Sequence, residues 1–197
     1  MGKPYSQACE NNKGPILDVL KVRLGGSRRL LEIGSGTGQH AVYFAALLPH
    51  LHWQTSDRLE NHAGINAWID DFPAANLHRP ICFTVGLDKW PDGGFDTVFT
   101  ANTTHIMQVP EAKLMMQMVA ENLTDNGVFC QYGPFNIDGQ YTSDSNQAFD
   151  QHLLSQGFGG IRDIAELQSW VAGSGLTLMQ RIQMPANNQL LVWQKLI

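Results

Sequence analysis

The chain has 197 residues, so a single domain over residues 1–197 is expected. Apolar residues make up 43% of it and charged residues 16%, which excludes intrinsic disorder as the main state. The formal net charge is -5, from 13 basic and 18 acidic side chains. This charge argues against a nucleic-acid partner, because no general basic surface is available.

No apolar run reaches the roughly 18 residues that span a bilayer, and residues 1–6 contain no apolar signal core. The three cysteines, Cys9, Cys82 and Cys130, are odd in number and far apart, which excludes a disulfide framework and a CxxC motif. The histidines have no metal-ligand spacing. We therefore expect a cytoplasmic protein without a metal ion or a membrane partner.

Short apolar runs alternate with longer stretches of helical period, which indicates an α/β fold. The first 13 residues are polar, and Pro15 is then expected at the start of a helix that runs to Leu24. The elements predicted next are a strand at 29–33, a glycine turn at 34–38, a buried helix at 41–48, a strand at 51–56, a helix around 65–72, and strands at 80–85 and 95–101.

The second half of the chain ends in two strands, 176–184 and 189–196, separated by only four residues. So short a connection permits only antiparallel pairing, because a parallel return needs a crossover of a dozen residues or more. The sequence thus predicts a doubly wound, mainly parallel seven-stranded sheet that ends in an antiparallel hairpin. The elements before this hairpin are a helix around 114–123, a strand at 128–132, a polar loop at 133–145, a helix around 149–153 and another at 164–171.

A glycine-rich turn follows the first predicted strand and opens a helix, in the pattern E-x-G-x-G-x-G from Glu32 to Gly38. A dinucleotide fingerprint requires G-x-G-x-x-G, but residue 39 is Gln, so the third glycine falls one position early. A phosphate-binding P-loop requires a lysine that this turn lacks. The turn instead resembles the first motif of class I S-adenosylmethionine-dependent methyltransferases.

That resemblance implies that the turn holds S-adenosylmethionine, with its glycines admitting the methionine and ribose parts of the cofactor. Glu32 would orient the loop or the ammonium group of the cofactor. A merely structural turn with a solvated Glu32 is the alternative. The residues expected in the turn are Gly34, Ser35, Gly36 and Gly38.

Two acids follow the next two strands. Asp57 lies 19 residues after Gly38, a spacing at which a carboxylate reaches ribose hydroxyls in open α/β sheets. Its alternative role is to cap the following helix. Asp88 could accept a hydrogen bond from the adenine amino group, although the segment 88–94 equally reads as a plain polar turn.

Nearly the whole chain resembles a small family within the class I methyltransferases, the one that includes methyltransferase-like protein 26. The resemblance implies the strand order 3-2-1-4-5-7-6 and S-adenosylmethionine binding, and it supplies no methyl acceptor. The segments that carry it are 5–17, 31–40, 55–57 with 60–61, 133–136, 160–163 and 184–188.

The carboxyl ends of the strands form the binding edge of an open α/β sheet, so residues there are expected around the cofactor and the acceptor. Asn102 follows the fourth strand and is a cofactor-site candidate. His105 is the candidate general base, because imidazole titrates near neutral pH, and a histidine bonded to backbone is the alternative. Tyr132, Phe135 and Asn187 are expected to wall the acceptor pocket, with Asn187 alternatively a turn residue.

The polar start of the chain is predicted to fold over the cofactor as a lid, and a frayed terminus is the alternative. Glu10, Asn11 and Lys13 are its candidate site residues. Arg162 could anchor an anionic substrate or could simply be solvated beside a helix cap.

The function predicted from these features is methyl transfer from S-adenosylmethionine to a small molecule, with a protein side chain as another possible acceptor. The segment 102–105, Asn-Thr-Thr-His, departs from the N-P-P-Y motif of nucleic-acid amino methyltransferases, which disfavours DNA and RNA further. A non-catalytic S-adenosylmethionine-binding or interaction protein and a dinucleotide-dependent oxidoreductase are the alternatives. Neither the acceptor nor the oligomeric state follows from the sequence.

Overall fold

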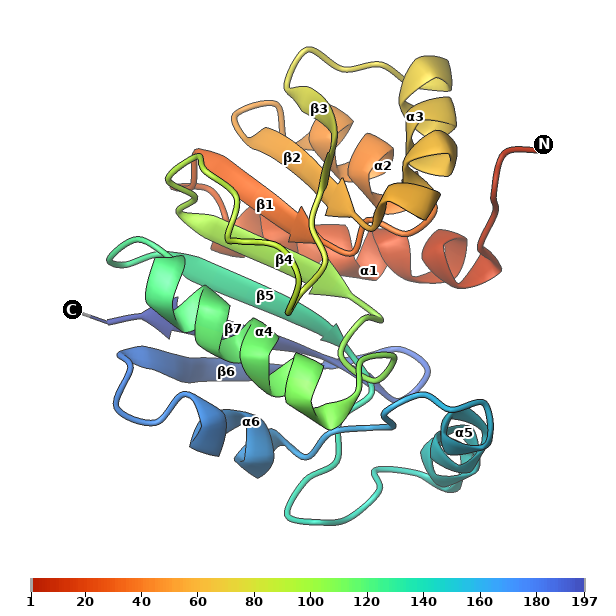
Figure 1. Ribbon diagram of the computed structural model, residues 1–197, viewed down its shortest axis with the longest axis vertical. Helices are drawn as coiled ribbons and strands as arrows, with labels where there is room; N and C mark the ends of the chain where they lie inside the picture. Colours follow the sequence, from red (N-terminus) through yellow and green to blue (C-terminus); the bar gives the residue numbers. More distant parts are fainter. Residues whose placement is uncertain (1, 197) are drawn as a thin grey trace.

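A twisted sheet of seven strands runs through the molecule and is covered by helices on both faces (Figure 1). The computed structural model describes residues 2–196. The strands lie in the order β3-β2-β1-β4-β5-β7-β6. They are β1 (Arg29–Ile33), β2 (His52–Asp57), β3 (Leu77–Cys82), β4 (Thr97–Ala101), β5 (Val128–Gly133), β6 (Leu176–Met184) and β7 (Asn188–Lys195).

The first five strands are parallel to one another, and β7 lies between β5 and β6 and is antiparallel to both. This arrangement confirms the predicted doubly wound α/β sheet, its strand order and its antiparallel hairpin. Ala186 and Asn187 in the hairpin turn both have φ of 58°, the left-handed conformation that reverses a chain tightly.

Two apolar cores lie on opposite faces of the sheet. Helices α1, α2 and α3 bury Leu20, Phe44 and Ile65 against one face, whereas α4 and α6 bury Met115 and Leu167 against the other. The helices are α1 (Gln7–Arg23), α2 (Gln39–Leu47), the short η1 (Leu59–Asn61), α3 (His62–Asp71), α4 (Val109–Asn122), α5 (Asp144–Ser155) and α6 (Ile164–Trp170).

The first helix begins eight residues earlier than predicted, and Pro15 lies inside it. Ser6 caps its start by accepting a hydrogen bond from the backbone N–H of Cys9 at 3.3 Å. The polar first turns are held by other elements, because Gln39 on α2 bonds to the backbone N–H and carbonyl of Ser6. Residues 7–13 are therefore helix and not a loose arm.

The third strand also differs from the prediction, since it spans Leu77–Cys82 rather than residues 80–85. Its register is set by pairing with β2, where Trp53 lies opposite the buried Leu77. The apolar Phe83 and Val85 lie beyond the strand and pack into the core on the α4 face. Because buried loop residues are apolar like buried strand residues, the sequence pattern placed them in the strand.

Candidate functional site

A cavity of about 1000 Å³ opens at the carboxyl ends of the parallel strands. Its wall is formed by α1, the loop between β1 and α2, the segments after β2, β3 and β4, the end of β5, α5 and the turn between β6 and β7. This is the edge at which open α/β sheets bind ligands. The size is at the upper end of the range of roughly 300–1,000 Å³ for small-molecule pockets.

The three glycines of the predicted motif have different roles, and two of them lie in this wall. Gly34 has φ of 73°, and a Cβ there would lie 2.9 Å from Oγ1 of Thr103. Gly36 has φ of 58°, lines the cavity, and has open space where a Cβ would project. Gly38, with φ of 92°, is not in the cavity wall; a Cβ there would lie 3.0 Å from Cα of Ile65. Its role is close packing of α2 against α3.

Glu32 lies beneath the glycine loop and is only 2% exposed. Its Oε2 accepts hydrogen bonds from Ser35 Oγ at 2.9 Å and from Trp53 Nε1 at 3.0 Å. Burial raises the pKa of this carboxyl to about 7, with a smaller contribution from the negative charge of Asp57, although both hydrogen bonds lower it. Glu32 is absent from the cavity wall, so of its two predicted roles the geometry supports orientation of the loop.

Asp57 lies at the end of β2 and lines the cavity. Its Oδ2 accepts a hydrogen bond from the backbone N–H of Gly36 at 2.7 Å, and its Oδ1 accepts from Arg58 N–H at 2.7 Å and from Asn61 Nδ2 at 2.8 Å. Arg58 and Asn61, and not Asp57, are the N-cap residues of η1 and α3. The carboxylate thus fixes the glycine loop while it faces the cavity.

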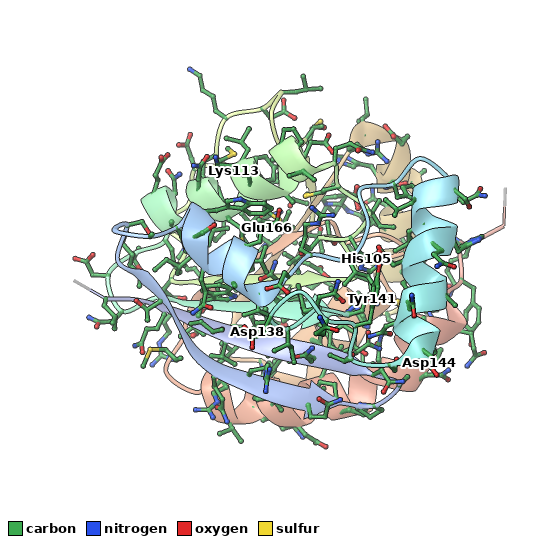
Figure 2. The ribbon with its side chains drawn as sticks, turned by 90° about the horizontal axis from the view of Figure 1, so that it is seen from below. His105, Lys113, Asp138, Tyr141, Asp144 and Glu166 are labelled. Carbon is green, nitrogen blue, oxygen red and sulfur yellow. The ribbon has the colours of Figure 1, made fainter. Side chains whose placement is uncertain are left out.

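Asn102 and His105 line the cavity after β4. Asn102 has φ of 54° and donates its backbone N–H to the carbonyl of Tyr132 at 2.9 Å. His105 is 5% exposed and packs edge to face on Phe149, with ring centroids 5.5 Å apart. Viewed from below, His105 and Tyr141 both lie beside α5 (Figure 2).

Burial lowers the pKa of His105 to about 4, and the negative charge of Asp150 opposes that shift. Among residues 2–196, no side chain or backbone group forms a hydrogen bond with its imidazole. The alternative of a histidine bonded to backbone is therefore not what the structure has. A neutral imidazole on a cavity wall can accept a proton from a bound molecule.

Polar residues that the sequence did not single out complete the wall. His40 Nε2 lies 2.6 Å from Oδ1 of Asn12, and both side chains are buried. Tyr132, a predicted wall residue, lines the cavity together with them and with Asn188. Asn12 lies in the polar start that was predicted to fold over the cofactor and in a segment that carried the family resemblance, but it was not among the predicted site residues.

Besides Glu32 and Gly38, four more of the residues predicted for the cofactor and the acceptor lie outside the cavity wall. Asp88 accepts a hydrogen bond from the backbone N–H of Thr84 at 2.7 Å, as in the plain-turn reading. Phe135 is buried in the core on the α4 face, because alternation along the chain turns Pro134 toward the cavity instead. The other two are Arg162, whose guanidinium donates to the carbonyls of Gly159 and Gly160, and Asn187, whose amide donates to Ser145 Oγ.

The candidate lid residues divide in the same way. Asn11 lines the cavity, whereas Glu10 and Lys13 form an ion pair with each other on α1. Glu10 also accepts a hydrogen bond from Gln39 Nε2 at 2.8 Å. Their contribution is to hold the start of α1 against α2.

Within residues 2–196, no group of three or more His, Cys, Asp or Glu side chains is arranged to hold a metal ion. The same part of the chain contains no helix with the length and apolar character needed to cross a membrane.

Solved structures similar to this chain are methyltransferases. An O-methyltransferase family 2 protein from Planctomyces limnophilus in complex with apigenin is 18% identical with a TM-score of 0.83, and covers 94% of this chain and 57% of that chain. An O-methyltransferase family protein from Burkholderia thailandensis is 18% identical with a TM-score of 0.78 over 93% and 56%. Human N-acetylserotonin methyltransferase in complex with S-adenosylmethionine is 14% identical with a TM-score of 0.75 over 96% and 58%.

The chain spans somewhat more than half the length of these proteins, and at such identities the likeness shows the fold alone. That fold is the α/β Rossmann-like methyltransferase fold. A protein-family model described as "Protein of unknown function (DUF938)" matches residues 3–195. Because that match spans nearly the whole sequence, the chain belongs to the DUF938 family.

Proposed function

We propose that this protein transfers a methyl group from S-adenosylmethionine to a small-molecule acceptor. The observation that carries the proposal is the bond between the Asp57 carboxylate and the backbone N–H of Gly36, at the edge of a cavity that both residues line. It joins a glycine loop and an acid at the end of β2, the pair of features expected around the ribose of such a cofactor.

The residues present fit this cofactor. Gly36 leaves open space where any other residue would project a Cβ, so a ligand can approach the loop closely. A carboxylate has about four lone-pair sites, and three protein donors bond to Asp57, which leaves acceptor capacity for a ribose hydroxyl. Phe83 and Val85 offer apolar wall beyond β3 for an adenine ring, in place of the predicted Asp88.

When bound, S-adenosylmethionine supplies a methyl group that leaves its sulfonium by in-line displacement. The protein must align the acceptor with that methyl group and exclude water. Phe149, Phe158 and Met107 provide apolar walls for this purpose beyond β4. His105 receives the proton of an acceptor hydroxyl or amine, since its lowered pKa keeps the imidazole neutral at pH 7.

The start of α1 covers one side of the same cavity, where Cys9, Asn11 and Asn12 contribute to the wall. Lys3 lies over the ring of Trp68, with Nζ 3.9 Å from the centroid, and Trp68 Nε1 donates to the carbonyl of Pro4 at 2.6 Å. We assign residues 2–13 a covering role, with the cofactor enclosed beneath a helix that is fastened to α2 and α3. Membership of the group that includes methyltransferase-like protein 26 stays a prediction.

Calorimetric titration with S-adenosylmethionine, S-adenosylhomocysteine, NAD and NADP tests the cofactor. We expect the first two to bind and the dinucleotides not to bind, and the reverse result would favour an oxidoreductase. Turnover is measured separately, as transfer of a labelled methyl group to a library of small hydroxylated molecules. Binding of S-adenosylmethionine without transfer to any of them, or to peptides, would favour a non-catalytic binding protein.

A further inference from the structure

Three buried polar side chains from three different elements lie in the cavity wall. His40 comes from α2, Asn12 from α1 and Tyr132 from β5, and they are 6%, 8% and 2% exposed. All three line the cavity. Burying polar groups is unfavourable unless they are hydrogen-bonded, and the surrounding apolar core does not require them. Their arrangement therefore points to a role toward a ligand.

The direction of the hydrogen bonds can be worked out from His40. Burial lowers the pKa of His40 to about 4, so its imidazole is neutral at pH 7 and carries a single N–H. Because its Nε2 lies 2.6 Å from the carbonyl oxygen of the Asn12 side chain, that N–H is on Nε2 and donates to Asn12. The amide nitrogen of Asn12 is then free to donate elsewhere.

The Tyr132 hydroxyl lies next in the same wall. Burial raises the pKa of Tyr132, and the nearby side-chain amides of Asn12 and Asn188 oppose that shift. The hydroxyl is therefore protonated at pH 7 and carries a hydrogen that it can donate.

No acceptor within residues 2–196 takes a hydrogen bond from the Tyr132 hydroxyl. Since Tyr132 lines the cavity, the remaining partner for this hydrogen is a bound molecule. The Tyr132 hydroxyl is thus a buried hydrogen-bond donor on the cavity wall that has no acceptor among residues 2–196.

Tyr132 and His105 lie on the two sides of the end of β5. A Cβ on Gly133 would be 3.7 Å from Nδ1 of His105, whereas Tyr132, the preceding residue, packs with the core on the α1 face. Successive residues of a strand face opposite sides, so a molecule lying across this strand end meets His105 on one side and Tyr132 on the other.

Charge in the wall restricts what that molecule can be. Of the described residues that line the cavity, Arg58 alone carries a fixed positive charge, and it lies beside Asp57 and pairs with Glu60. Arg162 donates to backbone carbonyls away from the wall. In the complex with S-adenosylhomocysteine, whose sulfide is uncharged, a carboxylate or phosphate next to Tyr132 would have no cationic side chain to pair with, which is costly in a partly buried site.

We propose that Tyr132 is a specificity-determining residue, which donates a hydrogen bond to an uncharged oxygen of the methyl acceptor, such as a ketone or ether, while the acceptor's nucleophile faces His105. This inference rests on the proposed function. It names the acceptor class as neutral hydroxylated compounds that carry a second, hydrogen-bond-accepting oxygen.

The test measures binding rather than turnover. Protein saturated with S-adenosylhomocysteine is titrated by calorimetry with the three hydroxyacetophenone isomers, with the matched ethylphenols, which lack the ketone, and with the matched hydroxybenzoates, which carry a charge. We expect at least one ketone isomer to bind about tenfold more tightly than its two counterparts, the value of one hydrogen bond.

Tyr132→Phe is expected to abolish this preference and to leave the affinity for the ethylphenol unchanged. Tyr43→Phe is the matched control, since Tyr43 is half-buried on α2 outside the cavity wall. Circular dichroism melting shows whether each variant is folded.

A wild-type protein that binds no ketone isomer, or binds it no more tightly than the ethylphenol, would overturn the inference. So would a folded Tyr132→Phe variant that keeps the preference, or one that loses affinity for S-adenosylhomocysteine alone, because Tyr132 would then face the cofactor. Failure of S-adenosylhomocysteine to bind to the wild type appears in the first titration, before any probe is added. That result overturns the proposed function and this inference together.

Discussion

Asp57 and Gly36 are 21 residues apart in the chain, and Oδ2 of the former accepts a hydrogen bond of 2.7 Å from the backbone N–H of the latter. The bond fixes the glycine loop to the end of β2. A single carboxylate therefore shapes the loop and faces the space where a cofactor would lie.

Replacing this carboxylate should weaken cofactor binding. We expect Asp57→Ala to reduce affinity for S-adenosylmethionine by about 1–3 kcal/mol, because a charged hydrogen-bonding partner is lost. Asp57→Asn keeps an oxygen that can accept from Gly36 and should lose less. Calorimetry on folded variants measures both, and an unchanged affinity in Asp57→Ala would remove Asp57 from the site.

The three motif glycines should respond differently to alanine. Gly38→Ala forces a Cβ to 3.0 Å from the backbone of Ile65 at a positive φ, so we expect the free energy of unfolding to fall by at least about 2 kcal/mol. A Cβ added at Gly36 would meet no other atom, so Gly36→Ala should lower the free energy of unfolding by only about 1–2 kcal/mol, the cost of a positive φ in a residue other than glycine. Its Cβ projects into the cavity, so affinity for S-adenosylmethionine should fall more than about tenfold.

Gly94→Ala is the control for this pair, because Gly94 has φ of 59° and open space but does not line the cavity. It should match Gly36→Ala in urea unfolding and leave cofactor affinity unchanged. Equal affinities in Gly36→Ala and Gly94→Ala would contradict the assignment of Gly36 to the site.

Glu32 should make the protein less stable as the pH rises. The pKa of Glu32 is about 7 in the folded state, against the ordinary value of 4.5 that the carboxyl has in the unfolded chain. Between these pH values Glu32 is ionised in the unfolded chain and stays protonated in the folded protein. The contribution is fully present below pH 4.5 and is lost as the pH rises to about 7, a change of about 3 kcal/mol.

Urea unfolding of the wild type and Glu32→Gln from pH 4 to 8 measures this contribution as a difference. The comparison is necessary because His40 and His105 have lowered pKa values, and their contribution to stability runs the opposite way, falling as the pH drops below 6.5. The stability of the variant relative to the wild type should rise between pH 4.5 and 7. A constant difference would show that Glu32 titrates normally.

His105→Gln should separate chemistry from binding. With an acceptor that must lose a proton, we expect transfer to fall by about 100-fold or more, while affinity for S-adenosylmethionine stays unchanged. Because the free imidazole has a pKa of about 4, wild-type kcat/KM should not decline on the acid side until well below pH 6. Full activity in the variant would exclude His105 as the base, whereas an acid limb near pH 6.5 that the variant lacks would show that the pKa of His105 is not lowered.

Gln39→Ala should release the start of α1. The side chain of Gln39 bonds to the backbone of Ser6 and to Glu10, with Ser6 N–H donating to its Oε1 at 2.6 Å. We expect faster amide exchange over residues 7–13 and weaker binding of S-adenosylmethionine. Gln54→Ala, at the junction of β2 and β3, should leave that segment unchanged. Faster exchange in 7–13 with full cofactor affinity would exclude the covering role.

The seven-stranded sheet could be predicted from the sequence, although its third strand was placed three residues too late. Alternating apolar runs and helical stretches predicted its strands and helices, and the four residues at 185–188 predicted the antiparallel hairpin, because a local turn limits how its two strands can pair. The glycine motif and Asp57 were also visible in the sequence, since their spacing is set by one strand, one turn and one helix.

Only the tertiary structure decided which polar residues share the cavity. Pro15 predicted the start of a helix, but contacts of Gln39 with Ser6 extend α1 backward and bring Asn12 to His40. Asp88 and Arg162 carry side chains that could bind a ligand, but both lie outside the cavity wall. There Asp88 accepts a hydrogen bond from a backbone N–H and Arg162 donates to backbone carbonyls. Such pairings depend on distances between residues far apart in the chain. Local pattern carries no information about those distances, because they are fixed only when the helices pack on the sheet.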